Sequence, residues 1–245
     1  MAAARLGAAT MAVAIAVGAA SDALAQSCPA PLAQARRLIL VTAGSMSATA
    51  AQLQTFERAS PAAAWRALGP AEPAVVGSAG MAWSHFFRQL ARQGEPIKLE
   101  GDKRAPAGIY QLGRSFGILA SSQPDYLHVN DDTVCVYDPS SPAYNTITSR
   151  AAIDAKVKVE NMSRIVPMYR RGIAVDYPTD ARARAGSCIF IHVWKTPTTA
   201  TAGCVAVPEP RVEALQEFSS RGAVIAILPR AALSRLSGCL PAVGR

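Results

Sequence analysis

The chain has 245 residues, of which half are hydrophobic and 17% are charged. This composition is typical of a compact globular protein and excludes an intrinsically disordered one, which would lack the apolar residues needed for a core. The formal net charge of +8 comes from Lys and Arg residues scattered along the chain, without a basic run or an aromatic-interleaved patch. We therefore expect no nucleic-acid partner. The charge fits either anionic surroundings, such as cell-wall carboxylates, or a simple solubilising role.

The first 25 residues have the features of a secretory signal peptide. Arg5 supplies a positive start, residues 6–20 are uncharged and mostly small or aliphatic, and Ala23-Leu24-Ala25 offers a small-x-small cleavage site. The apolar run is shorter than the roughly 20 residues that a membrane span needs. We expect cleavage after Ala25 and a monomeric product exported to the periplasm, without a membrane span. An uncleaved anchor is the alternative.

Residues 26–245 are expected to form one mainly β domain with a few helices. Pro and Gly interrupt the sequence frequently, and the short runs between them have the composition of strands. Residues 84–92 and 209–220 have the helical spacing of apolar side chains. Residues 138–145 and 195–202 are expected to be loops. The expected strands are residues 38–42, 52–58, 65–69, 74–77, 97–99, 108–112, 126–129, 133–137, 168–176, 188–194 and 223–228.

Five cysteines in an exported chain predict disulfides and one leftover thiol. Cys28 and Cys239 bracket the mature chain, so a bridge between them would tie its ends together. Cys135 and Cys188 lie in β-like runs that could be neighbouring strands. This pairing is one of the three that four cysteines allow. It leaves Cys204, which lies among small residues, as the candidate nucleophile.

The strongest chemical pattern lies within residues 186–206. A buried strand ends near His192, and a loop of small and polar residues leads from there to Gly203-Cys204. A cysteine attacks as the thiolate, and an adjacent imidazole can accept its proton. A glycine beside the nucleophile lets substrate and backbone approach closely. The pattern predicts a catalytic pair of Cys204 and His192. The alternatives are a packed strand-end histidine and an ordinary disulfide cysteine.

This segment resembles the YkuD-type L,D-transpeptidase family, whose nucleophile lies in a Gly-Cys dipeptide shortly after a histidine-ended strand. Residues 100–113 (EGDKRAPAGIYQLG) are similar to the family's Gly-Asp-x-x-x-Pro-x-Gly-x-Tyr/Phe segment. Residues 138–145 (DPSSPAYN) are similar to a loop of one proteobacterial branch. Residues 169–176 and 186–204 continue the likeness in the same order, so that it covers about residues 36–228. The resemblance implies the family's β-sandwich or barrel-like sheet, with a helix after the catalytic cysteine.

The chain departs from the family's commoner motif in the residues around the nucleophile. Much of the family has Ser/Thr-His-Gly-Cys, followed by an Asn two residues later. Here the threonine, glycine and cysteine are kept, but Ala202 stands in place of the histidine and Ala206 in place of the asparagine. The separation between base and nucleophile is also shorter. These departures bear on the choice of acceptor and not on the nucleophile.

The resemblance implies transpeptidation of peptidoglycan stem peptides. Cys204 would attack the diaminopimelate carbonyl of a donor stem, and His192 would take the thiol proton and return it to the leaving amine. The Val193 carbonyl would orient the imidazole, and backbone N–H groups around Gly203 and Cys204 would stabilise the oxyanion. An amine of another stem would then resolve the thioester. Weaker candidates for the substrate groove are Tyr144, Trp194 and Thr201.

Two other functions stay open at this point. Water in place of an amine would make the protein an L,D-carboxypeptidase or another peptide hydrolase, and the missing His and Asn favour this alternative. A non-catalytic cell-wall-binding protein on the same scaffold is the other. No cofactor and no metal are expected, because the remaining histidines, His85 and His128, have no metal-ligand spacing. No nucleotide-binding glycine pattern occurs either.

Overall fold

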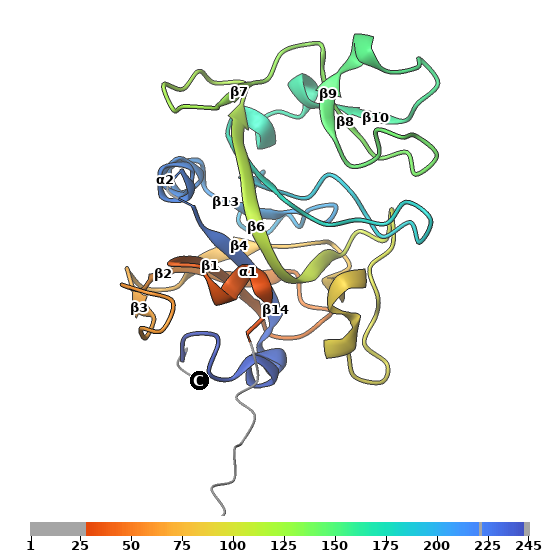
Figure 1. The fold of residues 1–245 in the computed structure, drawn as a ribbon. Helices are drawn as coiled ribbons and strands as arrows, with labels where there is room; N and C mark the ends of the chain where they lie inside the picture. Colours follow the sequence, from red (N-terminus) through yellow and green to blue (C-terminus); the bar gives the residue numbers. More distant parts are fainter. Residues whose placement is uncertain (1–27, 221, 243–245) are drawn as a thin grey trace, which may run out of the picture.

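Eight strands hydrogen-bond in a closed circuit and form a barrel (Figure 1). Their order is β1-β14-β6-β11-β12-β13-β4-β2, and β2 pairs again with β1. The structure is a computed structural model that describes residues 28–220 and 222–242, so the predicted signal peptide lies outside the described residues. The barrel strands are β1 (Arg37–Ala43), β2 (Ala50–Glu57), β4 (Glu72–Val75), β6 (Ala105–Gly117), β11 (Gly172–Val175), β12 (Phe190–Val193), β13 (Val205–Val207) and β14 (Val224–Pro229).

The other strands either extend the barrel wall or form a small separate sheet. Short strands β3 (Arg66–Ala67), β5 (Met81–Trp83) and β7 (Leu127–His128) pair with β2 or β6. The small sheet has the order β10-β8-β9 and lies beyond the end of β6 that carries β7 (Figure 1). Its strands are β8 (Thr133–Val136), β9 (Ile147–Ser149) and β10 (Val159–Asn161).

Helices are few and mostly short. The predicted helix after Cys204 is present as α2 (Glu209–Ser219), whose Val212 and Leu215 are buried in the main core. The remaining helical segments are α1 (Ala30–Ala33) and the 3-10 helices η1 (His85–Leu90), η2 (Arg150–Ala152), η3 (Met162–Arg164), η4 (Met168–Arg170) and η5 (Arg230–Leu236). The mainly β fold with few helices is therefore confirmed.

Strand alternation sorts the residues of the barrel wall into an inner and an outer set. On β12, Ile191 and Val193 belong to the main core, whereas Phe190 and His192 point outwards. On β13 the two valines likewise point inwards, and Ala206 points outwards. The outer face of these two strands is turned towards the small sheet, since Phe190 packs in one cluster with residues of β8. His192 and Ala206 lie on this face.

Strands β1 and β14 of the barrel are buried on both faces. Every residue of β14 is buried, and all but the first residue of β1 are. The two strands pair in parallel, and a continuous apolar run is typical of such doubly covered strands. Leu32 of α1 and Leu236 of η5 belong to the same core. The disulfide Cys28–Cys239 ties together the two chain segments that supply this cover.

Most of the predicted elements are present with boundaries shifted by a few residues, but three predictions are wrong in type or extent. Residues 97–99 form only one bridge, from Ile97 to Trp83. The predicted strand at 168–176 begins at Gly172, because η4 follows Pro167 and occupies its first part. The helix predicted at 84–92 is the 3-10 helix η1. Strands β5, β9, β10 and β13 have three residues each, too few for a recognisable period.

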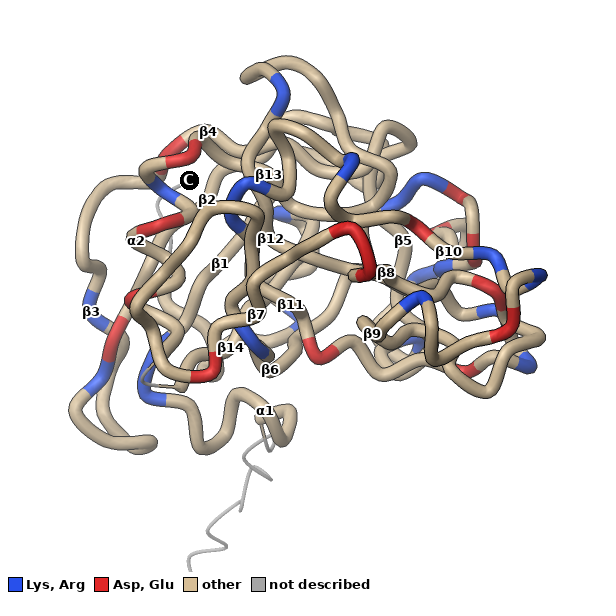
Figure 2. The backbone as a smooth tube through the Cα atoms, turned by 90° about the horizontal axis from the view of Figure 1, so that it is seen from above, with Lys and Arg blue, Asp and Glu red and all other residues tan. Residues whose placement is uncertain are grey.

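Charged residues are spread around the molecule, with Lys and Arg interleaved with Asp and Glu (Figure 2). Some form ion pairs that fasten distant segments. Arg235 of η5 pairs with Glu95 at 2.6 Å, and its hydrogen bond lowers the pKa of the Glu95 carboxyl to about 2. No helix in the described part of the chain is long and apolar enough to cross a membrane.

Candidate active site

The cysteines divide into two disulfides and one free thiol. The disulfides are Cys28–Cys239 and Cys135–Cys188, which is the pairing predicted from the sequence. Cys204 is free and buried. The second disulfide joins β8 of the small sheet to the segment just before β12. It therefore fastens the small sheet beside the outer face of the barrel strand that carries His192.

His192 lies on the outer face of β12 with its ring held by the backbone. Its Nδ1 is 2.8 Å from the carbonyl oxygen of Val193, as the family resemblance implies. A carbonyl only accepts, so Nδ1 carries the hydrogen and Nε2 of the neutral ring is the basic nitrogen. The neighbours in register are Gly172 on β11 and Ala206 on β13, whose small size leaves room for the ring. Tyr169 packs edge-on against the imidazole, with ring centroids 5.6 Å apart.

Cys204 immediately precedes β13, which runs parallel to β12. Ala206 is the register partner of His192, and Cys204 stands two residues before Ala206. Residues two apart on an extended strand point to the same face, so the thiol and the imidazole share the outer face of the sheet. Both side chains line one cavity of about 490 Å³. The local strand geometry thus brings the predicted nucleophile and base to one site.

The thiol and the imidazole are both held in their neutral forms. The Cys204 Sγ donates to the carbonyl oxygen of Cys188 at 3.5 Å. Burial raises the pKa of the Cys204 thiol to about 12, and the charge of nearby Glu160 acts in the same direction. Burial lowers the pKa of the His192 imidazole to about 4, against the smaller opposing effect of the Val193 carbonyl. Both shifts oppose the transfer of the proton from sulfur to nitrogen in this resting arrangement.

Gly203 and Thr201 shape the backbone that leads to the nucleophile. Gly203 has a φ of +146°, and a Cβ there would lie 3.0 Å from the carbonyl oxygen of Arg104, so the position requires glycine. The Thr201 hydroxyl donates to the carbonyl of Cys204 at 2.7 Å and accepts from the N–H of Gly203 at 3.1 Å. Because the Gly203 N–H donates to Thr201, it is already occupied by a partner within the protein.

Thr201 is the one predicted groove residue that lines the Cys204 cavity. Tyr144 lies outside this lining. Its hydroxyl donates to Glu100 at 2.5 Å and accepts from the N–H of Gly186 at 3.1 Å, so it holds the loop that precedes β12. Trp194 is half-buried and does not line the cavity either. The structure therefore does not bring Tyr144 and Trp194 to the nucleophile.

Several charged residues line the cavity that the sequence analysis did not single out. They are Lys98, Glu100, Lys103, Glu160 and Lys195. Lys98 is buried and paired with Asp102, whereas Lys103 and Lys195 are exposed. Glu160 lies on β10 and accepts a hydrogen bond of 2.5 Å from the Tyr169 hydroxyl. Lys98, Glu100 and Lys103 come from one segment, whereas Glu160 and Lys195 come from two others far away in the chain, and no local pattern marks the three segments as neighbours.

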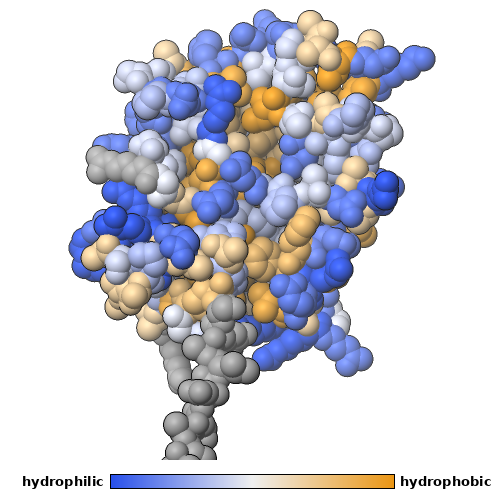
Figure 3. All heavy atoms as spheres, viewed as in Figure 1, coloured by the Kyte–Doolittle hydropathy of each residue, from blue (hydrophilic) through white to orange (hydrophobic). Residues whose placement is uncertain are grey.

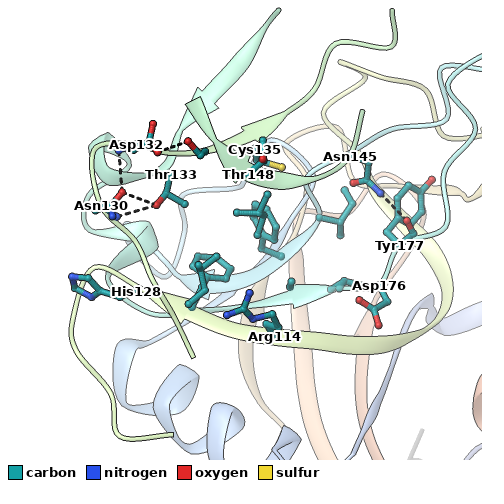
Figure 4. Close-up of a pocket in the computed structure, with 18 of the residues that line it drawn as sticks. Arg114, His128, Asn130, Asp132, Thr133, Cys135, Asn145, Thr148, Asp176 and Tyr177 are labelled. Carbon is teal, nitrogen blue, oxygen red and sulfur yellow. Dashed lines mark hydrogen bonds between the residues drawn. The ribbon is translucent and has the colours of Figure 1, made fainter. Parts of the chain in front are cut away.

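A second, larger cavity of about 740 Å³ lies next to the first (Figure 4). Cys135 lines this cavity and Cys188 lines the other, so their disulfide lies between the two, and Ile189 lines both. Apolar atoms show in a hollow between β7 and the small sheet (Figure 3). Charged and polar side chains that line the larger cavity include Arg114, His128, Asn130, Asp132 and Asp176. Cys204 and His192 are not among its lining residues.

The histidines other than His192 take no part in the Cys204 cavity. His128 lines the larger cavity, and His85 is half-buried in η1. Within residues 28–220 and 222–242, no group of three or more His, Cys, Asp or Glu side chains could hold a metal ion.

The chain matches no protein-family model and no curated protein. Its function must therefore be inferred from the residues and geometry of the site.

Proposed function

We propose that the protein is a cysteine acyltransferase of the L,D-transpeptidase type that acts on peptidoglycan stem peptides. One observation carries the proposal. The single free thiol, Cys204, shares a strand face and a cavity with His192, whose Nδ1 is fixed by the carbonyl of Val193. The resemblance of residues 100–113 and 186–204 to the L,D-transpeptidase family suggests the substrate class. The mainly β barrel with a helix after Cys204 is compatible with that family's fold.

The first half-reaction transfers the donor acyl group to sulfur. Cys204 Sγ attacks the carbonyl carbon of the diaminopimelate residue, a C–S bond forms, and the C–N bond to the terminal D-amino acid breaks. The Nε2 of His192 accepts the thiol proton and returns it to the leaving amine. The Cys204 N–H donates to the developing oxyanion, a contribution that typically amounts to a few kcal/mol. The neutral thiol–imidazole pair is the starting state that this sequence of transfers needs.

The second half-reaction transfers the acyl group to an amine. The nitrogen of an acceptor stem attacks the thioester, His192 takes a proton from that nitrogen, and the proton returns to the departing sulfur. The exposed Lys103 and Lys195 at the cavity would attract the carboxylates of stem peptides. Both half-reactions therefore use the same base, and the second one returns Cys204 to the free thiol.

Hydrolysis of the thioester is a second candidate function, favoured by one observation. Ala202 and Ala206 both line the Cys204 cavity, where the commoner family motif has His and Asn. A methyl group offers no hydrogen bond to an incoming amine, and the space it leaves admits water. On this alternative the protein is an L,D-carboxypeptidase that shortens tetrapeptide stems to tripeptides.

Incubation of the purified protein with disaccharide-tetrapeptides separates these functions. Cross-linked dimers together with free D-alanine are expected for the transpeptidase, and a Cys204→Ala variant should form neither. Tripeptide monomers without dimers would replace the transpeptidase by the hydrolase. Unchanged substrate, without any acyl adduct on Cys204, would contradict both and leave a non-catalytic wall-binding protein.

We also propose that the protein works outside the cytoplasm, in the periplasm. Residues 1–25 have the pattern of a signal peptide. The two disulfides are in keeping with an oxidising compartment. The amino-terminal residue of the protein isolated from cells is expected to be Gln26. A protein that retains Met1 and whose Cys28 and Cys239 are reduced would contradict export.

A further inference from the structure

In the small sheet, the acidic residue Glu160 lies in line with two neighbouring side chains, apolar Ile147 and disulfide-bonded Cys135. Glu160 on β10 is in register with Cys135 on β8, which is in register with Ile147 on β9. Residues directly opposite each other on antiparallel strands point to the same face. Ile147 and Cys135 line the larger cavity, whereas Glu160 lines the Cys204 cavity. The row therefore changes from apolar to acidic where it reaches the nucleophile.

The carboxylate of Glu160 is only partly satisfied by the protein. Its Oε1 accepts from the Tyr169 hydroxyl at 2.5 Å, and the Tyr169 ring packs against His192. Among the described residues, Glu160 forms no ion pair with Lys or Arg. Withdrawing a carboxylate from water without a cation is costly, and burial raises the pKa of Glu160 accordingly. A cationic group bound in the cavity would remove that cost.

The lysines of the cavity do not meet this need. Lys98 is paired with Asp102, whereas Lys103 and Lys195 are exposed to solvent. Lys103 lies on the loop before β6 and Lys195 lies on the loop after β12, while Glu160 lies on the small sheet. Of the two carboxylates that line the cavity, Glu100 already accepts from the Tyr144 and Ser187 hydroxyls, whereas Glu160 accepts only from Tyr169. The cavity thus offers one partly satisfied carboxylate and separate cations on different parts of its wall. Such a wall suits a substrate that carries both an ammonium group and carboxylates.

We propose that Glu160 is a specificity-determining residue that binds a primary ammonium group of the substrate at the Cys204 cavity. The inference rests on the proposed acyl transfer. The ammonium group could belong to the donor, next to the carbonyl that acylates Cys204, or to the acceptor before it attacks the thioester. In either case it donates to the carboxylate that Tyr169 leaves partly free. Amide-blocked substrates would lose this contact and leave the half-buried Glu160 carboxylate with the Tyr169 hydroxyl as its hydrogen-bond partner.

The two half-reactions distinguish the two sources of the amine. For the donor, intact-protein mass spectrometry monitors thioester formation with two substrates. One is a tetrapeptide stem with a free side-chain amine, and the other is the same stem acetylated at that amine. The wild type is expected to prefer the free amine by about ten- to a hundredfold in kcat/KM, and Glu160→Gln is expected to bring that ratio close to one. For the acceptor, Glu160→Gln is expected to reduce aminolysis relative to hydrolysis of one preformed thioester by about tenfold or more.

The variants are chosen so that loss of folding is not mistaken for loss of specificity. Glu160→Gln keeps the size of the side chain and can still accept from Tyr169, and Glu160→Asp keeps the charge and should retain part of the preference. Glu217→Gln removes the same charge from an exposed position on α2 and should leave both ratios unchanged. Thermal unfolding of all variants verifies that each one is folded.

The outcomes separate this inference from the function on which it rests. A wild-type protein that forms a thioester, combined with unchanged donor and acceptor ratios in Glu160→Gln, overturns the role of Glu160 and leaves the acyl transfer intact. A wild-type protein that forms no thioester with any donor overturns both. A change in either ratio with Glu160→Gln, restored in part by Glu160→Asp, supports the inference.

Discussion

Two cavities flank the Cys135–Cys188 disulfide, and they share Ile189 as a lining residue. The larger one, about 740 Å³, is lined by apolar side chains together with charged and polar ones such as Arg114 and Asp132 (Figure 4). The smaller one, about 490 Å³, holds a free thiol, an imidazole of fixed tautomer and a carboxylate. Volume therefore does not identify the site that we propose to be reactive. The register of two parallel strands does, because it sets the nucleophile and the base on one face.

The largest expected effect comes from removing the nucleophile. Cys204→Ala should lower acyl transfer by at least about a thousandfold, because no other described residue of that cavity is a free thiol. The matched change in the larger cavity, His128→Ala, should alter the rate by less than about twofold. Product formation from disaccharide-tetrapeptides measures both. Equal losses in the two variants would remove the distinction between the cavities.

The pH dependence of thiol labelling tests whether the pair is neutral before attack. With a Cys204 pKa near 12, the thiolate fraction rises about tenfold for each pH unit below that value, so alkylation by iodoacetamide should climb steadily from pH 6 to 9. Acylation by substrate instead requires a neutral imidazole, and should fall as the pH drops through about 4, the pKa of His192. A labelling rate that is already level below pH 7 would indicate a preformed thiolate–imidazolium pair.

The two disulfides provide a matched pair of changes, one beside the cavities and one remote from them. Replacing both Cys135 and Cys188 by Ser should lower the free energy of unfolding by about 2–4 kcal/mol and reduce acyl transfer by about tenfold or more. The second effect is expected because the Cys188 carbonyl accepts the thiol hydrogen of Cys204. Replacing both Cys28 and Cys239 by Ser should lower stability by a similar or larger amount.

The remote pair should nevertheless leave the rate unchanged at temperatures where the variant is folded. Denaturant unfolding and product assays at one low temperature separate the two effects. A rate that falls equally in both double variants would show that the disulfide beside the cavities stabilises the fold without positioning the thiol.

Thr201→Ala removes the hydroxyl that connects the Cys204 carbonyl to the Gly203 N–H. The expected results are a loss of about 1 kcal/mol in stability and about a tenfold lower kcat, because the backbone at the nucleophile loses its support. Thr201→Ser, which keeps the hydroxyl, should restore most of the rate. Kinetics of the two variants side by side measure the contribution of the hydroxyl. No recovery with Ser would assign the effect to the methyl group instead.

The smallest effect on catalysis is expected for Tyr144→Phe. The Tyr144 hydroxyl donates to the Glu100 carboxylate and accepts from the N–H of Gly186, and Tyr144 does not line the Cys204 cavity. Stability should fall by about 1–3 kcal/mol, since one buried and one partly buried hydrogen bond are lost, while KM for the donor changes less than about threefold. A large rise in KM with unchanged stability would place Tyr144 in the substrate groove after all.

The proximity of Cys204 and His192 could be predicted from the sequence because its signals are local. A buried apolar strand carries His192, and a loop leads from it to Gly203-Cys204. The parallel pairing of β12 with β13, which fixes their shared face, is seen only in the structure. The mainly β fold and the pairing of the four bridged cysteines follow from similarly simple patterns.

The rest of the site depends on tertiary packing that no local pattern encodes. Glu160 lies on a three-residue strand, and Tyr169 lies in a 3-10 helix where a strand is predicted. Tyr144 and Trp194 are weaker candidates for the groove in the sequence analysis, and neither lines the Cys204 cavity. Which side of its loop an aromatic ring faces depends on partners such as Glu100, which precede it by 44 residues.

Intact-protein mass spectrometry of the wild type with a tetrapeptide donor tests the central claim most directly. The proposal predicts an adduct with the mass of the donor less its terminal D-alanine, located on Cys204 by peptide mapping and absent from Cys204→Ala. An unmodified Cys204 in folded protein at saturating donor, or the same adduct in Cys204→Ala, would contradict it.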